Sequence, residues 1–453
     1  MAALRIRSAL CYHNAMDVTL QQMLSARDAR VAEQQQLAAK YGLPVVCLTM
    51  NIAGPVKRTP LSVMGFLTGA ERIRASLKGR IKAERLSTWP ATGCTGFFLV
   101  EGKADEVKGR TVEIEEADGL GRLLDIDVTT CEGEKLSRAV PRRCLVCGGP
   151  AFECARSRAH GLQKVLDITR EILLHAWTQR MGALARGALL AEAEATPKPG
   201  LVDLSGAGAH TDMDIDSFRA SANALHPYFT MMSETAAGLS AASAGEILSA
   251  LRPGGVEAQK AMERATGGVN THKGAIYSMG ILCAALTISA LNGAHWREWA
   301  LALGKEGMKC RAAITVSGPR SNGERLYAQY GVAGIIGEAA AGFPHLNYGL
   351  ERLRIYEGKG FNANDRAVLT LLDLMAVMED TNAIHRGGFE GLQFMREGCA
   401  RLLTLGEEER LSRMWELDAE LTARNISPGG CADMRALSLF VKPCLPCFEE
   451  GTI

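Results

Sequence analysis

Alternating and helical patterns of apolar residues both occur in the N-terminal third of the chain. The polar, glutamine-rich residues 18–40 are typical of an exposed helix, and the apolar run PVVCLTM at residues 44–50, followed by the turn-like IAGPVK, is typical of a strand. Further extended segments are expected at residues 95–101, 110–116 and 123–129. The pattern therefore predicts an α+β domain.

From about residue 159 onward the pattern changes to long segments rich in Ala, Leu, Glu and Arg, interrupted by Gly and Pro. The clearest of these segments are residues 162–194, 245–251, 275–291 and 367–380. They predict an all-α domain. No Pro- or Ser-rich linker separates the two patterns, so the change of pattern alone places the boundary, and we expect domains at residues 1–178 and 179–453.

Residues 274–294 contain no charged side chain and are long enough to span a membrane. Gly, Ser, Thr, Asn and many Ala residues dilute the segment, which suits a helix buried among other helices. We therefore expect no membrane contact. The C-terminal KPCLPCFEE is expected to be a flexible tail without chemistry.

The 51 Lys and Arg residues nearly balance the 50 Asp and Glu residues among 453. No overall basic field favours nucleic acid, so an anionic ligand must be held by a local cluster, which suits a small phosphorylated substrate. The N-terminal residues contain no apolar core long enough for a signal peptide. We therefore expect a cytoplasmic protein whose thirteen cysteines are mostly free thiols.

Two aspartates, Asp125 and Asp127, lie two residues apart in the extended segment GRLLDIDV. Alternate residues of a strand project from the same face, so both carboxylates can meet one Mg²⁺ ion. Such an ion neutralises a polyphosphate and its leaving group, and Lys57 and Arg122 could supply phosphate contacts. The alternative is the polar face of an edge strand with solvated cations nearby.

The segment RRCLVCGGPAFECARSRAH has the ligand types of a zinc site, in Cys144, Cys147, Cys154 and His160. Zinc takes four such ligands in a tetrahedral arrangement, although the spacing to the third cysteine differs from that of the commonest fingers. The alternative is a set of loop thiols beside a histidine at a helix N-terminus. The segment is also basic, through Arg142 and Arg143, which suits a polyphosphate or an acidic carrier protein.

The run RATGGVNTHKGAIYSMG is not a phosphate-binding loop of the common kind, because that motif needs Ser or Thr directly after Gly-Lys. We expect instead that Gly267 and Gly268 allow the backbone to approach a ligand closely. His272 and Lys273 would contact its phosphates at a helix N-terminus.

Charged and polar residues in the other Gly-rich loops of the second half are expected to join this run in one magnesium–polyphosphate site. The members are Lys198, Asp203, His210, Asp212, Asp214, Asn270, Thr271, Glu338, Asp380, Asn382, Arg386 and Asp433. The alternative for aspartates such as Asp203 and Asp214 is helix capping.

At these motifs the sequence resembles two families, and the match covers nearly the whole chain. ARDARVAEQQQLAAKYG, NIAGPVK, GRLLDIDV and RRCLVC…CARSRAH resemble the citrate lyase holo-acyl-carrier-protein synthases. TPKPGLVD, GAHTDMD, ATGGVNTHKGAIYSMG, GEAAAGFP and RNISPGGCAD resemble the triphosphoribosyl-dephospho-CoA synthases. The chain thus looks like a fusion of the two.

The resemblance implies that the second half joins ATP to 3'-dephospho-CoA and releases adenine. The first half would then transfer the phosphoribosyl-dephospho-CoA unit to a serine of the citrate lyase acyl carrier subunit and release pyrophosphate. Asp125 and Asp127 would support this metal-assisted displacement, in a domain that is nucleotidyltransferase-like by analogy.

For the adenine-releasing step the candidate catalytic carboxylates are Asp212, Asp214 and Glu338, because cleavage of the glycosidic bond develops positive charge at the ribose. Asp212 and Asp214 would also be metal ligands. The triphosphate is retained in this step, so Lys198, His272, Lys273 and Mg²⁺ would hold it. The resemblance of the motifs that contain these residues implies their roles.

Three positions, Ala53, Ile336 and Cys431, depart from the expected family pattern. Ile336 removes a phosphate contact beside Glu338. Two alternatives stay open, namely the same chemistry serving malonate decarboxylase and a non-catalytic CoA- or nucleotide-binding adaptor for the carrier protein. Paired carboxylates argue against the adaptor, since such a protein needs phosphate contacts but no metal ligands.

Overall fold

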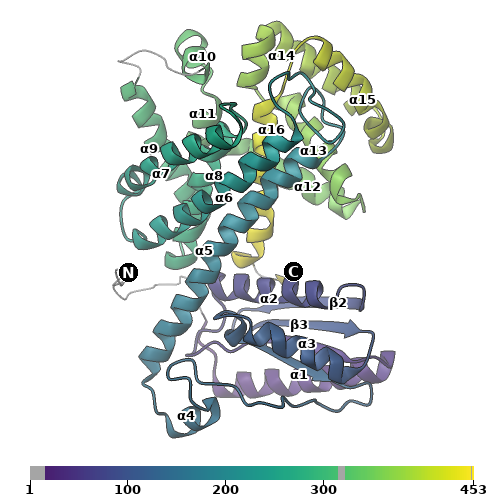
Figure 1. Cartoon of the computed structure of the whole chain (residues 1–453), viewed down its shortest axis with the longest axis vertical. Coiled ribbons are helices and arrows are strands. Elements are labelled where there is room, and N and C mark those ends of the chain that lie inside the picture. Colours follow the sequence, from purple (N-terminus) through teal and green to yellow (C-terminus); the bar gives the residue numbers. More distant parts are fainter. Residues whose placement is uncertain (1–15, 315–321, 450, 453) are drawn as a thin grey trace. The chain divides into compact units, whose positions relative to one another are not determined.

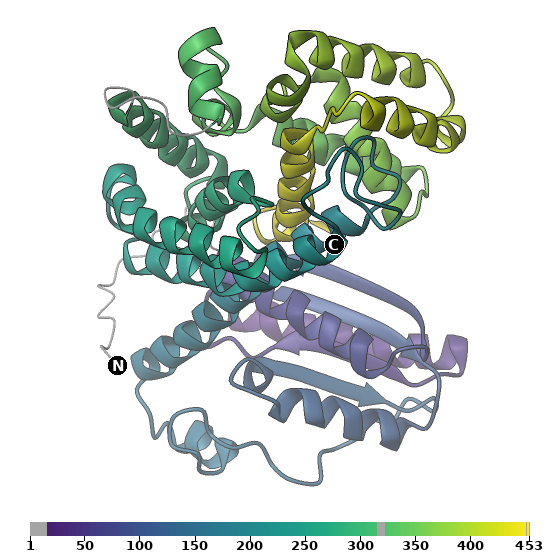
Figure 2. The same cartoon turned by 45° about the horizontal axis from the view of Figure 1, so that its top comes forward.

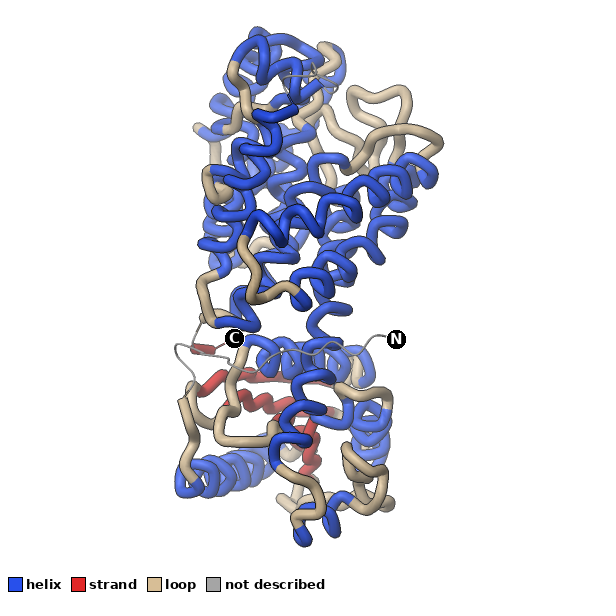
Figure 3. The backbone as a smooth tube through the Cα atoms, turned by 90° about the vertical axis from the view of Figure 1, so that its left-hand side faces the viewer, coloured by secondary structure: helices blue, strands red, loops and turns tan. Residues whose placement is uncertain are grey.

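The chain forms two compact units in a computed structural model that describes residues 16–314, 322–449 and 451–452 (Figures 1 and 3). The first unit contains the described residues up to Trp177 and, in addition, those from Cys444 onward. The second unit runs from Thr178 to Pro443. The division along the chain therefore lies between Trp177 and Thr178, within a long helix.

The first unit is built on a five-stranded antiparallel sheet of order β4-β1-β3-β2-β5. Its strands are β1 (Val45–Met50), β2 (Ile81–Trp89), β3 (Gly93–Val100), β4 (Leu124–Thr129) and β5 (Gly451–Thr452). All eight residues of the central strand β3 are buried, as its apolar sequence requires. The predicted α+β class is confirmed for this unit.

Helices cover both faces of this sheet. The helical elements of this unit are α1 (Leu20–Tyr41), α2 (Pro60–Ser76), α3 (Ala104–Glu116), the 3-10 turn η1 (Gly121–Leu123), α4 (Ala151–Ser157) and the start of α5 (Leu162–Glu194). On one face Ala38 of α1 packs against Val45, Cys47, Phe97 and Leu99. On the other, α2 lies so close that a Cβ on Gly69 would be 2.8 Å from the Leu124 side chain.

The expectation of an extended segment at residues 110–116 is wrong, because these residues belong to α3. Their alternating β-branched residues suggested a strand. The buried positions Val107, Thr111 and Ile114, however, follow one another at intervals of four and three residues, which is the spacing of one helix face.

The expected flexible tail is also ordered through most of its length. Cys444 and Cys447 are buried in the 3-10 helix η3 (Lys442–Cys447), and Phe448 meets the ring of Trp177 edge to face at 6.2 Å. Thr452 of β5 pairs with Ser87 of β2. The C-terminal residues thus complete the sheet of the first unit.

The second unit is all-α, as predicted. Besides the rest of α5 it contains α6 (Ile215–Gly238), α7 (Ala244–Ala265), α8 (Lys273–Asn292), α9 (Trp296–Ile314), α10 (Asn322–Tyr330), α11 (Gly334–Ala340), α12 (Pro344–Gly358), α13 (Ala363–Val377), α14 (Thr381–Leu403), α15 (Glu407–Ala423) and α16 (Gly429–Val441). The loop between α5 and α6 lies beside the start of α16 (Figure 2). That neighbourhood forms the site described below.

Helix α8 is the apolar segment for which a membrane span was considered. It is long and apolar enough to cross a membrane, with a mean hydropathy of 1.8 in its best window, but 89% of that window is buried inside the protein. It contacts α6, α7, α9, α11 and α16. The expectation of a helix buried among other helices is confirmed.

Candidate functional site

A cavity of about 700 Å³ in the second unit, called here the C-terminal cavity, is lined by the ends of several helices and the loops between them. It brings together nine residues that the sequence predicted for one site, namely Lys198, His210, Asp212, Asn270, Thr271, His272, Asn382, Arg386 and Asp433. Its volume lies in the range of small-molecule sites, about 300–1,000 Å³.

A buried network of charges lies at one wall of this cavity, where Glu192 and Lys198 line it and Arg435 contacts Glu192. Lys198 Nζ donates to Glu192 Oε1 at 3.0 Å, and Arg435 Nη2 donates to the same oxygen at 2.7 Å. The side chains of Lys198, Glu192 and Arg435 are 1%, 5% and 0% exposed. Two cations therefore share one carboxylate, and the network carries a net positive charge that suits an anionic ligand.

Burial acts in opposite directions on the pKa values of Lys198 and Glu192. It lowers the pKa of Lys198 to about 8, although Glu192 acts in the other direction. Burial also acts to raise the pKa of Glu192, but Lys198 and Arg435 outweigh it and hold that pKa below its usual value. The carboxylate is therefore ionised at neutral pH, and the lysine titrates within reach of physiological pH.

The loop TPKPGLVD places Lys198 by means of one aspartate and one glycine. Asp203 accepts hydrogen bonds from the backbone N–H of Lys198 at 3.0 Å and of Ser205 at 2.7 Å. Gly200 has a φ of 71°, and a Cβ there would lie 2.1 Å from the carbonyl oxygen of Ile426. Asp203 thus organises the loop and does not face a ligand.

The first turn of α8 presents unpaired polar atoms beside the cavity. His272 is 3% exposed, and its Nδ1 hydrogen-bonds Ser221 Oγ at 2.6 Å. Its Nε2 and Thr271 Oγ1 are buried and have no hydrogen-bond partner among the described residues. Burial lowers the pKa of His272 to about 4, so the imidazole is neutral at physiological pH. A bound ligand would satisfy these two atoms.

Asp433 on α16 faces the same turn of α8. A Cβ on Gly274 would lie 2.0 Å from Asp433 Oδ2, so only glycine at that position admits this carboxyl group. Burial raises the pKa of Asp433 well above its usual value, and Glu192 and Asp380 add to the effect. Burial therefore favours the protonated form of this carboxyl group at the wall of the cavity.

On another side of the cavity, His210 is held by neighbours from distant segments. Its Nε2 hydrogen-bonds Ser427 Oγ at 2.8 Å, and its Nδ1 lies 3.7 Å from Asp212 Oδ1. Arg386 donates to the carbonyl oxygens of Ala209 and Asn425. Asp212 is 61% exposed at its side chain, so it is the solvent-facing carboxyl group of this site.

In the first unit, β4 places Asp125 and Asp127 on one face, opposite Thr49 and Cys47 of β1. Each carboxylate already has a cationic partner. Lys135 Nζ lies 2.7 Å from Asp127, and Arg142 Nη2 lies 3.1 Å from Asp125.

Two cavities adjoin this strand. Asp125 and Lys57 line a small one of about 100 Å³, where Lys57 donates to the carbonyl oxygen of Ile52 at 2.6 Å. Burial lowers the pKa of this lysine.

The larger one, of about 660 Å³, is rich in cations, among them Lys108, Arg122, Arg138, Arg142 and Arg143. Arg142 is anchored by Nη1, which donates to the carbonyl oxygen of Leu124 at 2.9 Å, and by an ion pair with buried Glu115. It links this cavity to Asp125.

Both halves of the chain match known families. Residues 178–447 match the family described as ATP:dephospho-CoA triphosphoribosyl transferase, and residues 18–176 match that described as apo-citrate lyase phosphoribosyl-dephospho-CoA transferase. Protein CitXG of Haemophilus influenzae is 34% identical over 93% of this chain and 96% of its own length. The chain belongs to this family of fused transferases.

Further relatives show the same division. Protein CitXG of Leuconostoc mesenteroides subsp. cremoris is 31% identical over 94% of this chain and 97% of its own length. The 2-(5''-triphosphoribosyl)-3'-dephosphocoenzyme-A synthase of Haemophilus ducreyi is 35% identical over 67% of this chain and all of its own. The chain is therefore a bifunctional enzyme of citrate lyase prosthetic-group biosynthesis, and the adaptor alternative is excluded.

Several residues expected in the triphosphoribosyl transferase site lie elsewhere. Asp214 is the N-cap of α6 and accepts a hydrogen bond from Ser217 N at 2.8 Å, so the capping alternative describes it. Glu338 accepts from the backbone N–H of His345 at 2.7 Å and does not line the C-terminal cavity. The expected pair Asp212 and Asp214 is therefore separated, with only Asp212 at the cavity.

Gly267, Gly268 and Lys273 of the ATGGVNTHKG run also lie away from the C-terminal cavity, where contacts with the ligand were expected. Gly267 and Gly268 are exposed, with φ values of 65° and 94°, and do not line the cavity. Lys273 is exposed and lines a second, more apolar cavity of about 280 Å³ together with Arg311 and Ile336. Adjacent residues of a first helical turn point in different directions, so His272 and Lys273 face different cavities.

Sequence reasoning missed three participants, Glu192, Arg435 and Ser427. Glu192 and Arg435 lie in mostly apolar helical segments, outside the Gly-rich loops from which the site was predicted. Arg435 in the run MRALSLF was a usable signal, because a buried arginine requires a partner. That partner is 243 residues away in the sequence.

Proposed function

We propose that ATP and 3'-dephospho-CoA bind in the C-terminal cavity and react there. The 2'-hydroxyl oxygen of dephospho-CoA attacks C1' of the ATP ribose, the bond from C1' to the adenine nitrogen breaks, and the hydroxyl proton is released. Adenine leaves with a proton, and the triphosphate stays on the transferred ribose. The products are adenine and 2'-(5''-triphosphoribosyl)-3'-dephospho-CoA.

The observation that carries this proposal is the positive network at the cavity wall. Lys198 and Arg435 exceed the charge of Glu192 by one, and the unpaired Thr271 Oγ1 and His272 Nε2 stand beside them at the start of α8. A triphosphate needs such donors and gains from the positive end of a helix dipole. This wall therefore anchors the part of ATP that does not leave.

Two carboxyl groups in different environments, one buried and one exposed, supply the proton transfers. Burial raises the pKa of Asp433 and so favours its protonated form, which can donate a proton to the departing adenine. Asp212 is exposed, so it can stabilise the positive charge that develops on the ribose and accept the proton of the attacking hydroxyl. After release of products, solvent restores both groups to their starting states.

Magnesium fits the donor set of each unit. Mg²⁺ is usually held by one or two carboxylates together with substrate phosphates. Asp212 at the C-terminal cavity, and Asp125 and Asp127 on β4, meet that requirement. A bound ion would neutralise charge on the polyphosphate.

In the first unit, we assign the transfer to the face of β4 and the cationic cavity beside it. The serine hydroxyl of the carrier subunit attacks the α-phosphorus of the intermediate, the bond to the leaving pyrophosphate breaks, and the serine proton passes to the pyrophosphate that leaves. Asp125 lies between Lys57 on one side and Arg142 on the other. These cations can hold the phosphates during the displacement.

The C-terminal assignment is tested by measuring adenine release from ATP and Mg²⁺ with and without 3'-dephospho-CoA. Release that depends on dephospho-CoA, with the coupled product seen by mass spectrometry, is the expected result. Adenine release that is independent of dephospho-CoA would show that the cavity hydrolyses ATP and does not join the two substrates.

Asp125→Asn should lower loading of the carrier subunit by about 100-fold or more, the usual cost of removing a charged group from a polar transition state. Adenine release should be unchanged, because it takes place in the other unit. Loading is followed by the mass increase of the carrier subunit. Glu84→Gln is a matched control, since Glu84 also lies on a strand of the sheet and also pairs with an arginine, Arg74. Equal loading by both variants would contradict the role of Asp125.

The KM for ATP should rise as the pH increases through about 8. Lys198 has a pKa of about 8 in the folded protein, so its attraction for phosphate is present below that pH and is lost above it. Between pH values of about 8 and 10.5 the Lys198 amine is protonated in the unfolded chain but largely neutral in the folded protein. The contribution of Lys198 therefore makes the free energy of unfolding rise with pH over this range.

The matched variant is Lys198→Arg, whose guanidinium does not titrate in this range. Its KM for ATP should show no step near pH 8, whatever its absolute value. An identical step in the variant would assign the titration to another group.

A further inference from the structure

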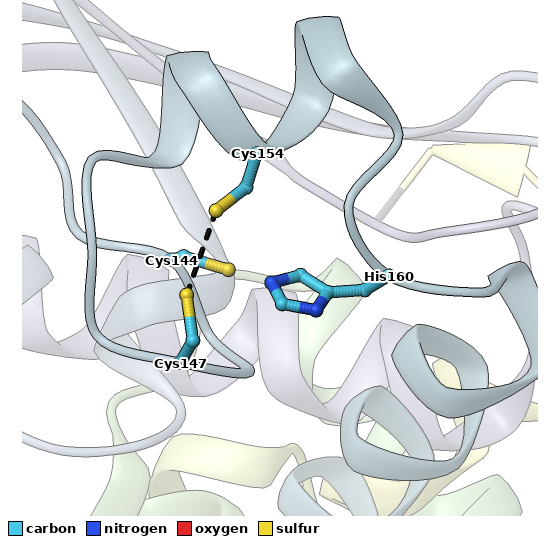
Figure 4. A group of neighbouring side chains, drawn as sticks. All are labelled: Cys144, Cys147, Cys154 and His160. Carbon is cyan, nitrogen blue, oxygen red and sulfur yellow. Dashed lines mark hydrogen bonds between the residues drawn. The ribbon is translucent and has the colours of Figure 1, made fainter.

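The cysteine and histidine residues between β4 and α5 converge in the structure. The Sγ atoms of Cys144, Cys147 and Cys154 and a ring nitrogen of His160 all lie within 4.8 Å of one another (Figure 4). Cys147 Sγ and Cys154 Sγ are 3.5 Å apart. Ligands of a tetrahedral zinc ion, with bonds of about 2.0–2.3 Å, are separated by roughly 3.5–3.8 Å.

The turn that carries the first two cysteines is shaped for a metal. The backbone N–H of Val146 points at Cys144 Sγ at 3.4 Å, and that of Gly148 donates to the carbonyl oxygen of Cys144 at 3.0 Å. Gly148 has a φ of 74°, which closes the turn. An N–H directed at sulfur favours the thiolate, the form that binds metal.

His160 points into this group from the opposite side, after α4 (Figure 4). Its Nε2 is buried and has no hydrogen-bond partner among the described residues. A buried ring nitrogen without a partner is costly, and a metal ion would satisfy it. This is an observation independent of the cysteine spacing.

Backbone hydrogen bonds shape this segment, but it has no hydrophobic core of its own. None of residues 145–161 is buried, and α4 buries no side chain. Short segments without a hydrophobic core are usually held by metals or disulfides. Three thiols and an imidazole make a complete zinc site, whereas a disulfide would use only two of the four groups.

We propose that Cys144, Cys147, Cys154 and His160 bind one structural zinc ion. The ion fixes the hairpin-like turn in which Arg143 pairs with Pro150, and with it Arg142, which lies two residues before the first ligand. Arg142 contacts Asp125 at 3.1 Å. The zinc site thereby holds this arginine beside Asp125, and the metal site itself does not depend on the function proposed for that aspartate.

Metal analysis of the full chain, purified without a histidine tag or added metal, should find one zinc ion per chain. Each of Cys144→Ser, Cys147→Ser, Cys154→Ser and His160→Ala should lower this content at least several-fold. Cys131→Ser is the matched control, because Cys131 is an exposed free thiol of the same connecting segment and lies outside the cluster. It should retain the zinc. Zinc content that is equal in all variants would overturn the proposal.

A second measurement covers variants that fail to fold. In the wild-type chain, Cys144, Cys147 and Cys154 should resist a thiol reagent until a chelator is added, with the sites of labelling read by peptide mass spectrometry. Exposed Cys147 would react at once if it were a free thiol. Labelling that is the same with and without chelator would show that no zinc site exists.

Discussion

Gly200→Ala should abolish adenine release and destabilise the second unit. The new Cβ would lie 2.1 Å from the carbonyl oxygen of Ile426, which is backbone and cannot rotate away, and the φ of 71° is one that alanine adopts only at a cost. We expect a loss of about 2–5 kcal/mol in the free energy of unfolding. The loop must shift, and Lys198, two residues earlier, shifts with it.

The measurements are chemical unfolding followed by circular dichroism, and adenine release at saturating substrate. Gly360→Ala is the matched control, since Gly360 has a φ of 82° and open space around its Cβ position. Gly360→Ala should lower the free energy of unfolding by only about 1–2 kcal/mol, because the left-handed backbone conformation is its only source of strain, and it should leave adenine release intact. If the two variants lose the same stability and activity, the contact with Ile426 does not determine the conformation of the loop.

Lys198→Met should weaken ATP binding so far that adenine release at ordinary ATP concentrations falls by about 100-fold. A charge-assisted contact to phosphate contributes about 1.5–3 kcal/mol, and the methionine also leaves Glu192 as an anion less well neutralised at the cavity wall. Arg435 still holds Glu192 at 2.7 Å, so the fold should survive with a loss of about 1–3 kcal/mol.

The test separates binding from chemistry, because the loss should appear mainly as an increased KM for ATP and less in kcat. Lys309→Met is the control. Lys309 is 71% exposed and pairs with Glu306 on the surface of α9, so its replacement should change neither constant. An unchanged KM for ATP in Lys198→Met would show that Lys198 does not bind the triphosphate.

The sequence predicted the class of each unit because local periodicity records which side of an element faces a core. Strands β1 and β4 and the buried helix α8 were all visible in this way. The segment 110–116 was misread because its β-branched residues alternate, whereas the buried positions of α3 follow helical spacing. Strand β5 was not foreseen, since two residues at the chain's end carry no pattern of their own.

The candidate residues divide in a similar way. The loop motifs identified Lys198, His210, Thr271, His272 and Arg386, which the fold gathers around one cavity. Sequence spacing could not say which of two neighbours faces a ligand. Asp212 lines the cavity while Asp214 caps α6, and His272 lines it while Lys273 does not. Those outcomes depend on where each helix begins.

By itself the sequence determined the two fold classes, the two transferase families and the residue types of each site, because these reside in local pattern and in contiguous motifs. Only the tertiary structure decided the partners of the buried charges. Glu192 binds Arg435 across 243 positions, and the loop at Gly200 fits against Ile426. The physical reason is that the cost of burying a charge depends on what packs against it, and those neighbours come from distant parts of the chain.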